Sequence, residues 1–122
     1  MVLVRLIRMS LEEEIIELTD KWYKYVGMDH HKDRDCHWYI TKTYSYGEEP
    51  YWEASHYGYR SEVWHSPKCG TEELAETLLR DKLKKLVEEA IWYLKRDIDD
   101  PTALDWMGKT KEQVEQMIKE LE

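Results

Sequence analysis

The chain has 122 residues, 42% of them hydrophobic, which is enough for a single domain, residues 1–122, to bury a core without disulfides. Its 26 acidic residues outnumber its 18 basic residues. This net charge of -8 disfavours nucleic acid as a partner, because every bound phosphate must be neutralised by Lys or Arg. No apolar run approaches the ~20 residues that span a bilayer, and the basic, apolar stretch Met1–Arg8 precedes no small-residue cleavage site. These features predict a cytoplasmic protein with no membrane partner.

A capping box marks the first strong helix. Ser10 and Glu13 have the Ser-x-x-Glu spacing in which each side chain satisfies a backbone amide of the first turn. Apolar residues then recur at spacings of three and four, and Gly27 is a typical helix end. The pattern predicts an amphipathic helix from Ser10 to Gly27, whereas residues 2–7 fit either an edge strand or an ordered arm.

The segment Cys36–Trp64 holds most of the tyrosines and half of the tryptophans. Two alternating runs flank Gly47–Pro50, and aromatic and β-branched residues suit a pleated surface, so we expect a β-hairpin that continues into a third strand. One register places Tyr46 opposite Tyr51, and a slip of one residue exchanges the two faces of the second strand. Both registers put aromatic residues on both faces, and both remain open.

One face of such a sheet must cover the helices, so the other face presents tyrosines and small polar residues. Amphipathic aromatics of this kind favour interfaces, which predicts an interaction surface, self-association included. An ordinary solvated face is the alternative, because single exposed aromatics are normal. The residues predicted for this surface are Tyr39, Tyr44, Tyr51, Tyr57 and Tyr59.

Two cysteines and two histidines raise the alternative of a metal site. Cys36, His37, His65 and Cys69 could supply the nitrogen and sulfur ligands of tetrahedral zinc. Against zinc, the chain has no Cys-x-x-Cys pair, and Cys36 and His37 point to opposite faces if both lie on a strand. Solvated loops around a buried thiol are the competing interpretation, and a Cys36–Cys69 disulfide is a third. We predict no cofactor.

Catalysis has little support in the sequence. Cys69 lies just before the long helix, and His65 lies four residues before Cys69. A helix N-terminus and a nearby histidine can both activate a thiol as a nucleophile. The adjacent negative charges of Glu72 and Glu73 disfavour the thiolate. Neither a third, orienting residue nor a glycine-rich phosphate loop is evident. The sequence therefore leans towards a protein that is not an enzyme.

The strongest helical pattern follows Thr71, a suitable cap, and ends near Lys95 and Arg96, which suit a helix C-terminus. We expect Glu76 and Arg80, four residues apart on its wet side, to form an ion pair. This helix completes an α-β-β-β-α core over residues 10–97.

Residues 98–122 are predicted to form a helical tail. Asp100 and Pro101 are typical of a helix start and Gly108 of a helix end. Thr110 and Gln113 then form a second capping box, for a helix that runs to Leu121. We expect the tail to pack back on the domain or on a neighbouring subunit.

Three features carry a resemblance to known families: the aromatic hairpin, the segment Tyr57–Arg60 and the helix start Gly70–Ala75. With the order α-β-β-β-α they resemble small phage-encoded ABA sandwich proteins, and the helix start is similar to that of HicB-type antitoxins. The topology also resembles double-stranded-RNA-binding domains, but this chain has Glu72, Glu73 and Glu76 where those domains have basic residues. The HicB strand signature with proline is absent. The resemblance implies a fold more than an activity.

The sequence as a whole predicts an α+β protein–protein interaction module whose partner is itself or another protein. A zinc-binding protein and an antitoxin-like inhibitor of a basic enzyme are the alternatives.

Overall fold

The structure is a computed structural model that describes residues 10–26, 37–58 and 61–122. Its elements are α2 (Leu11–Val26), β1 (His37–Thr43), β2 (Tyr51–Gly58), β3 (Ser61–His65), α3 (Glu72–Asp97), α4 (Pro101–Met107) and α5 (Lys111–Leu121). The strands form one antiparallel sheet in the order β1-β2-β3. The predicted α+β order is therefore confirmed. Among the described helices, none is both long enough and apolar enough to cross a membrane.

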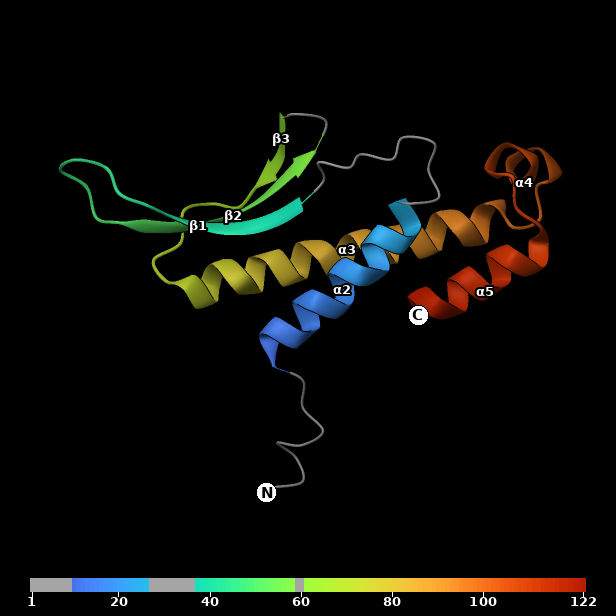
Figure 1. The fold of residues 1–122 in the computed structure, drawn as a ribbon, viewed down its shortest axis with the longest axis horizontal. Coiled ribbons are helices and arrows are strands. Elements are labelled where there is room, and N and C mark those ends of the chain that lie inside the picture. Colours follow the sequence, from blue (N-terminus) through green and yellow to red (C-terminus); the bar gives the residue numbers. More distant parts are fainter. Residues whose placement is uncertain (1–9, 27–36, 59–60) are drawn as a thin grey trace, which may run out of the picture.

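Helix α3 is the axis on which the other elements are arranged (Figure 1). The sheet covers its N-terminal half, α2 packs along its middle, and α5 packs against its C-terminal half. The tail therefore folds back on the same chain, as one of the two predicted arrangements required. The result is a molecule with a sheet end and a tail end.

Two hydrophobic clusters correspond to these two ends. Ala54, Leu79 and Leu83 form the buried cluster under the sheet. The cluster at the tail end contains Val87, Ala90, Leu94, Val114, Met117, Ile118 and Leu121. Leu18 and Trp22 of α2 pack against both clusters, so α2 joins the two halves of the core.

The pairing of β1 with β2 matches neither of the two registers considered. Thr43, not Tyr46, lies opposite Tyr51, and Trp38 lies opposite His56. This shift of three residues, being odd, turns the second strand's faces over as a slip of one would. Ile40 and Ala54 thereby share the face that packs on α3, and the ring of His56 stacks on that of Trp38 at 4.0 Å.

The physical reason for this register lies in the hairpin turn. The amide of Glu48 donates to the carbonyl of Ser45 at 3.1 Å, and Gly47 has a φ of 79°, which glycine adopts without steric cost. The turn thus centres on Tyr46–Gly47 rather than on the two glutamates that follow. A longer loop results, and Tyr46 projects from it fully exposed.

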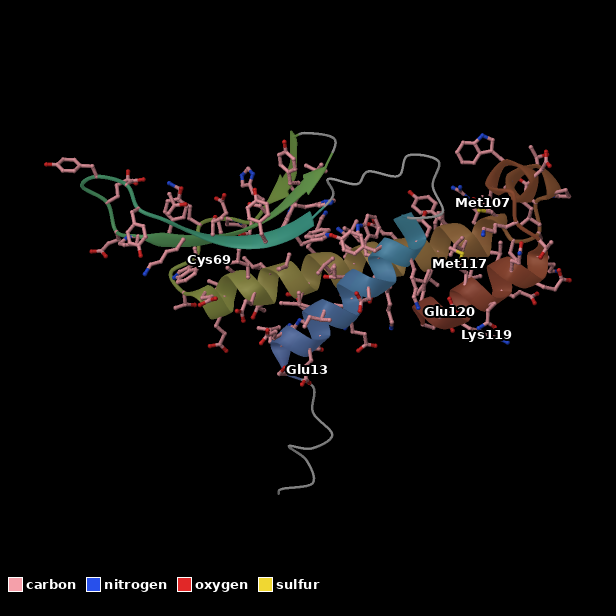
Figure 2. All side chains as sticks on the ribbon, in the orientation of Figure 1. Glu13, Cys69, Met107, Met117, Lys119 and Glu120 are labelled. Carbon is pink, nitrogen blue, oxygen red and sulfur yellow. The ribbon has the colours of Figure 1, made fainter. Side chains whose placement is uncertain are left out.

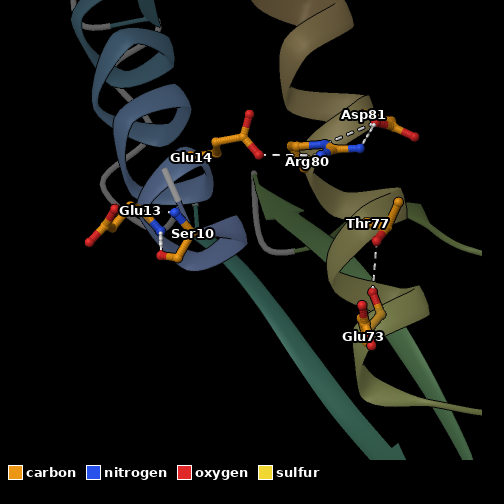
Figure 3. A network of polar contacts seen from close by, with 7 residues as sticks. All are labelled: Ser10, Glu13, Glu14, Glu73, Thr77, Arg80 and Asp81. Carbon is orange, nitrogen blue, oxygen red and sulfur yellow. Dashed lines mark hydrogen bonds and ion pairs between the residues drawn. The ribbon is translucent and has the colours of Figure 1, made fainter. Parts of the chain in front are cut away.

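Helix ends agree with the capping residues that the sequence predicts. Ser10 and Glu13 form the first capping box, with both hydrogen bonds at 3.2 Å (Figure 3). Thr71 accepts from the amide of Leu74, and Thr110 forms the second box with Gln113. Asp100 caps α4, and Gly108 ends it in the left-handed conformation. The predicted end at Gly27 lies outside the described residues.

The ion pair that we expected between Arg80 and Glu76 is not formed, and Arg80 has other partners. Its guanidinium reaches across to Glu14 of α2 at 3.2 Å and also contacts Asp81 at 3.1 Å (Figure 3). Arg80 pairs with Glu14 rather than Glu76 because α2 and α3 pack side by side. This ion pair bridges α2 and α3 on the solvent-exposed side of their interface, and Leu18 and Trp22 pack on its apolar side.

The core at the sheet end gives the first prediction. Leu83 is fully buried, so Leu83→Ala should lower the free energy of unfolding by about 2–5 kcal/mol, the cost of lost burial plus a cavity. Leu74 stands on the same helix but is 47% exposed, so Leu74→Ala should cost less than about 1 kcal/mol. Urea unfolding followed by circular dichroism measures both. Equal losses for the two variants would contradict this placement of the core.

Candidate functional site

The face of the sheet turned away from α3 is the first candidate surface, and we call it the outer sheet face. Because Trp38, Ile40 and Ala54 pack towards the helices, their neighbours along each strand point outward. The outer sheet face consists of Tyr39, Thr41, Thr43, Tyr51, Glu53, Ser55, Tyr57 and His65. In the described parts of the chain no helix covers it (Figure 1).

The predicted interaction residues divide between three places. Tyr39, Tyr51 and Tyr57 lie together on the outer sheet face, and each is half-buried. Tyr44 lies beyond the end of β1 and is 71% exposed, with the ammonium group of Lys42 5.2 Å from its ring centre. Tyr59 lies outside the described residues. Three of the five predicted tyrosines are thus brought onto one surface.

Tyrosines and short polar residues make up most of the outer sheet face. Glu53 lies on this face, Glu62 pairs with Tyr57 in the register of β2 and β3, and Ser55 at its centre is 2% exposed. Ser55 pairs with Tyr39 of β1 and with His65 of β3. Paired residues on neighbouring antiparallel strands are close enough for their side chains to touch. The face is therefore a layer of tyrosine rings and short polar side chains.

The candidate zinc ligands do not converge where the structure describes them. His65 pairs with Ser55 and so lies on the outer sheet face, whereas Cys69 pairs with Trp52 and lies on the helix side. Cys36 lies outside the described residues, and His37 is described only by its backbone at the start of β1. Within residues 10–26, 37–58 and 61–122 no group of three His, Cys, Asp or Glu could hold a metal. The four-ligand site stays a prediction.

Cys69 is a buried free thiol rather than an accessible nucleophile (Figure 2). It is 2% exposed, and its Sγ donates to the carbonyl of Pro67 at 3.2 Å. His65 faces the other side of the sheet, which separates the proposed base from the sulfur.

Ser66 closes the free edge of β2 beside this thiol. Its Oγ accepts from the amide of Ala54 at 3.0 Å and donates to the carbonyl of Pro67 at 2.9 Å. Its own amide donates to the carbonyl of Ala54 at 2.8 Å. Beyond it, Cys69 and Trp52 exchange both backbone hydrogen bonds. The segment 66–69 therefore acts as a short continuation of β3.

The Ser66 hydroxyl gives the second prediction. Ser66 is fully buried, and Ser66→Ala leaves the buried amide of Ala54 without an acceptor, so the free energy of unfolding should fall by about 1–3 kcal/mol. Ser45 is exposed in the hairpin turn, and Ser45→Ala should change it by less than about 0.5 kcal/mol. Chemical denaturation compares the two. A Ser66→Ala protein as stable as the parent would show that its hydroxyl is dispensable.

The beginnings of α2 and α3 bring four carboxylates together. Burial raises the pKa of Glu76, and the negative charges of Glu72, Glu12 and Glu73 raise that pKa further. Glu12 comes from a different helix, so this cluster exists only in the folded chain. It is the feature of the described structure that best suits a basic partner.

The raised pKa of Glu76 gives the third prediction. Protonated Glu76 favours the folded state, so its contribution to stability is present at acidic pH and is lost as pH rises through the folded pKa. At neutral pH, Glu76→Gln should therefore stabilise the protein by roughly 0.2–0.5 kcal/mol, the size of a like-charge helix pair. At pH near 3 the two proteins should be equally stable, because an ordinary glutamate is also protonated there.

Thermal unfolding at both pH values measures this difference. Glu89→Gln changes an exposed carboxylate of α3 outside the cluster and should bring no gain. A Glu76→Gln protein that is stabilised equally at acidic and neutral pH would show that the charge of Glu76 is not the cause.

A cavity at the tail end is a site that the sequence did not indicate. It has a volume of about 410 Å³ and is walled by rings from three helices: Tyr25 of α2, Tyr93 of α3 and Trp106 of α4. Met107 and Met117 contribute apolar lining where α4 and α5 meet α3 (Figure 2). Asp97 and Asp100 supply its carboxylates.

Sequence reasoning missed this cavity because its walls come from distant positions in the chain. The available signal was the grouping of aromatic and aspartate residues around the end of the long helix, at Trp92–Tyr93 and Asp97–Trp106. We interpreted these residues only as helix ends and caps. No family model, curated protein or solved structure matches this chain, so the geometry alone carries the functional argument.

Proposed function

We propose that this chain is a protein–protein interaction module that self-associates through its outer sheet face, without catalysis. The observation that carries the proposal is the layer of Tyr39, Tyr51 and Tyr57, which no described helix covers. Tyrosine provides a large, rigid and amphipathic contact area, and Thr and Ser beside it provide adaptable hydrogen bonds. This composition is typical of interfaces.

Charge explains why two acidic copies would meet at this face. The chain has a net charge of -8, so most approaches between copies are repulsive. Tyr, Thr and Ser make up most of the outer sheet face, so two such faces approach with less repulsion than the acidic helix surfaces would. Two sheets packed face to face also interdigitate their side chains at about 10 Å, which buries the tyrosine rings of both copies.

A second candidate function is inhibition of a basic partner protein, which the acidic cluster of Glu12, Glu72, Glu73 and Glu76 favours. That proposal agrees with the resemblance to antitoxins, and the α-β-β-β-α order agrees with a phage-encoded origin. A zinc-binding function gains no comparable support from the described residues.

Self-association gives the fourth prediction. Sedimentation velocity of the parent protein should show a dimer or larger species, and Thr41→Arg should shift it to monomer, since a long hydrated cation would enter the middle of the interface. The fold should tolerate this change, because position 41 is exposed and lies opposite Glu53. Gln116→Arg adds the same charge on exposed α5 and should leave the association unchanged.

Circular dichroism of each variant checks that it is folded. A parent protein that remains monomeric at high concentration would refute the proposal, and so would an association that Thr41→Arg leaves intact.

A further inference from the structure

The cavity at the tail end combines the two features that recognise an organic cation. Tyr25, Tyr93 and Trp106 contribute aromatic rings to its lining, and Asp97 and Asp100 contribute carboxylates. Ring faces attract cations through their quadrupole, most strongly where water is excluded. We propose that this cavity receives an arginine side chain from a basic partner protein, at a surface separate from the outer sheet face.

Size and shape agree with this ligand. A volume of about 410 Å³ lies within the range of pockets that enclose small organic groups. A guanidinium needs flat faces above and below and acceptors at its edge, which rings and carboxylates supply together. The floor of Leu94 and Met117 suits the aliphatic part of an arginine side chain.

The protein's own Arg96 shows that rings at this end of α3 accept a guanidinium. Its Cζ lies 4.9 Å from the ring centre of Tyr93 and 5.5 Å from that of Trp92. It also holds Asp97 through two hydrogen bonds of 2.9 and 3.3 Å. Arg96 is therefore a template for the contacts that a second guanidinium would make inside the cavity.

The carboxylates retain acceptor capacity for that second guanidinium. Asp100 receives the amides of Thr102 and Ala103 on the same oxygen, Oδ1, which leaves Oδ2 to accept from a ligand. Arg96 pairs with Asp97 and Lys111 with Asp99, and among the described residues no cationic side chain pairs with Asp100. The remaining negative charge selects a cationic occupant over a neutral aromatic one.

Charge also disfavours insertion of the hairpin tip of a second copy of this chain into the cavity. Tyr46 projects fully exposed from the hairpin and has a suitable ring, but Glu48 and Glu49 follow it directly. Inserting that tip would bring two more carboxylates to a cavity that already holds two. A basic segment meets no such repulsion, and the net charge of -8 draws it in.

The test uses the indole N–H signals of the full-length protein in ¹H–¹⁵N spectra. The probes are a glycine-serine peptide with one central arginine and the same peptide with glutamine in its place. The arginine peptide should shift the Trp106 signal, which Trp106→Ala identifies by its loss, and the shift should saturate. The glutamine peptide should leave that signal in place.

Variants locate the binding within the cavity. Trp106 is 67% exposed, so Trp106→Ala should stay folded, and its peptide Kd, followed on backbone amide signals, should rise about tenfold, the factor for one lost ring–cation contact. Trp106→Phe keeps a ring and should recover most of the affinity. Asp97→Asn should weaken binding about threefold, as loss of a partly screened charge. Tyr46 is a control ring, because it is fully exposed in the hairpin turn and does not line the cavity, so Tyr46→Ala should keep the parent's Kd.

Three outcomes would overturn the inference: equal binding of the glutamine peptide, an unchanged Kd in Trp106→Ala, or an equal loss in Tyr46→Ala. Methylguanidine alone should bind more weakly than the peptide, and equal binding would replace the protein partner by a free small cation and so overturn that part. The Thr41→Arg protein should bind the arginine peptide with the parent's Kd. That result keeps this inference distinct from self-association through the sheet.

Discussion

The packing of α2 on α3 is the interaction on which the remaining structure depends. Helix α3 carries a stripe of buried residues along its full length, but the sheet covers only its first half and α5 only its second. Leu18 and Trp22 of α2 contact the cores of both halves. Without α2 the two clusters would be separate, and each would be too small to hold its end of the molecule against the entropy of the chain.

This arrangement divides the molecule into two ends with different surfaces. The sheet end presents a layer of tyrosines and short polar residues, which suits contact with a surface of the same kind. The tail end encloses a cavity whose rings and carboxylates suit a cation. Because α3 lies between them as a long rigid element, contacts at the two ends are physically separate and can be altered one at a time.

The acidic residues of the described chain lie outside its buried core and affect the molecule through their charge. Glu12, Glu72, Glu73 and Glu76 gather at one helix junction, where burial raises the pKa of Glu76 and the charges of the other three raise it further. Such clusters cost stability and persist where solvent or a basic partner compensates them. The same excess of negative charge repels copies at their charged surfaces, which is why the proposed self-association uses the tyrosine layer.

The sequence by itself determined the elements and their ends. Ser10 with Glu13, Thr71, Asp100, Gly108 and Thr110 with Gln113 act through neighbours within four residues, so local chemistry was sufficient to place them. The α+β order was also predictable, and so was the shared face of Tyr51 and Tyr57, because side chains alternate along a strand. The position of Tyr39 on that same face depends on the hairpin register. Only the tertiary structure decided the hairpin register, the partner of Arg80 and the cavity between Tyr25, Tyr93 and Trp106. Each of these depends on which helix lies beside which, and packing over the whole chain fixes that choice where residue spacing cannot.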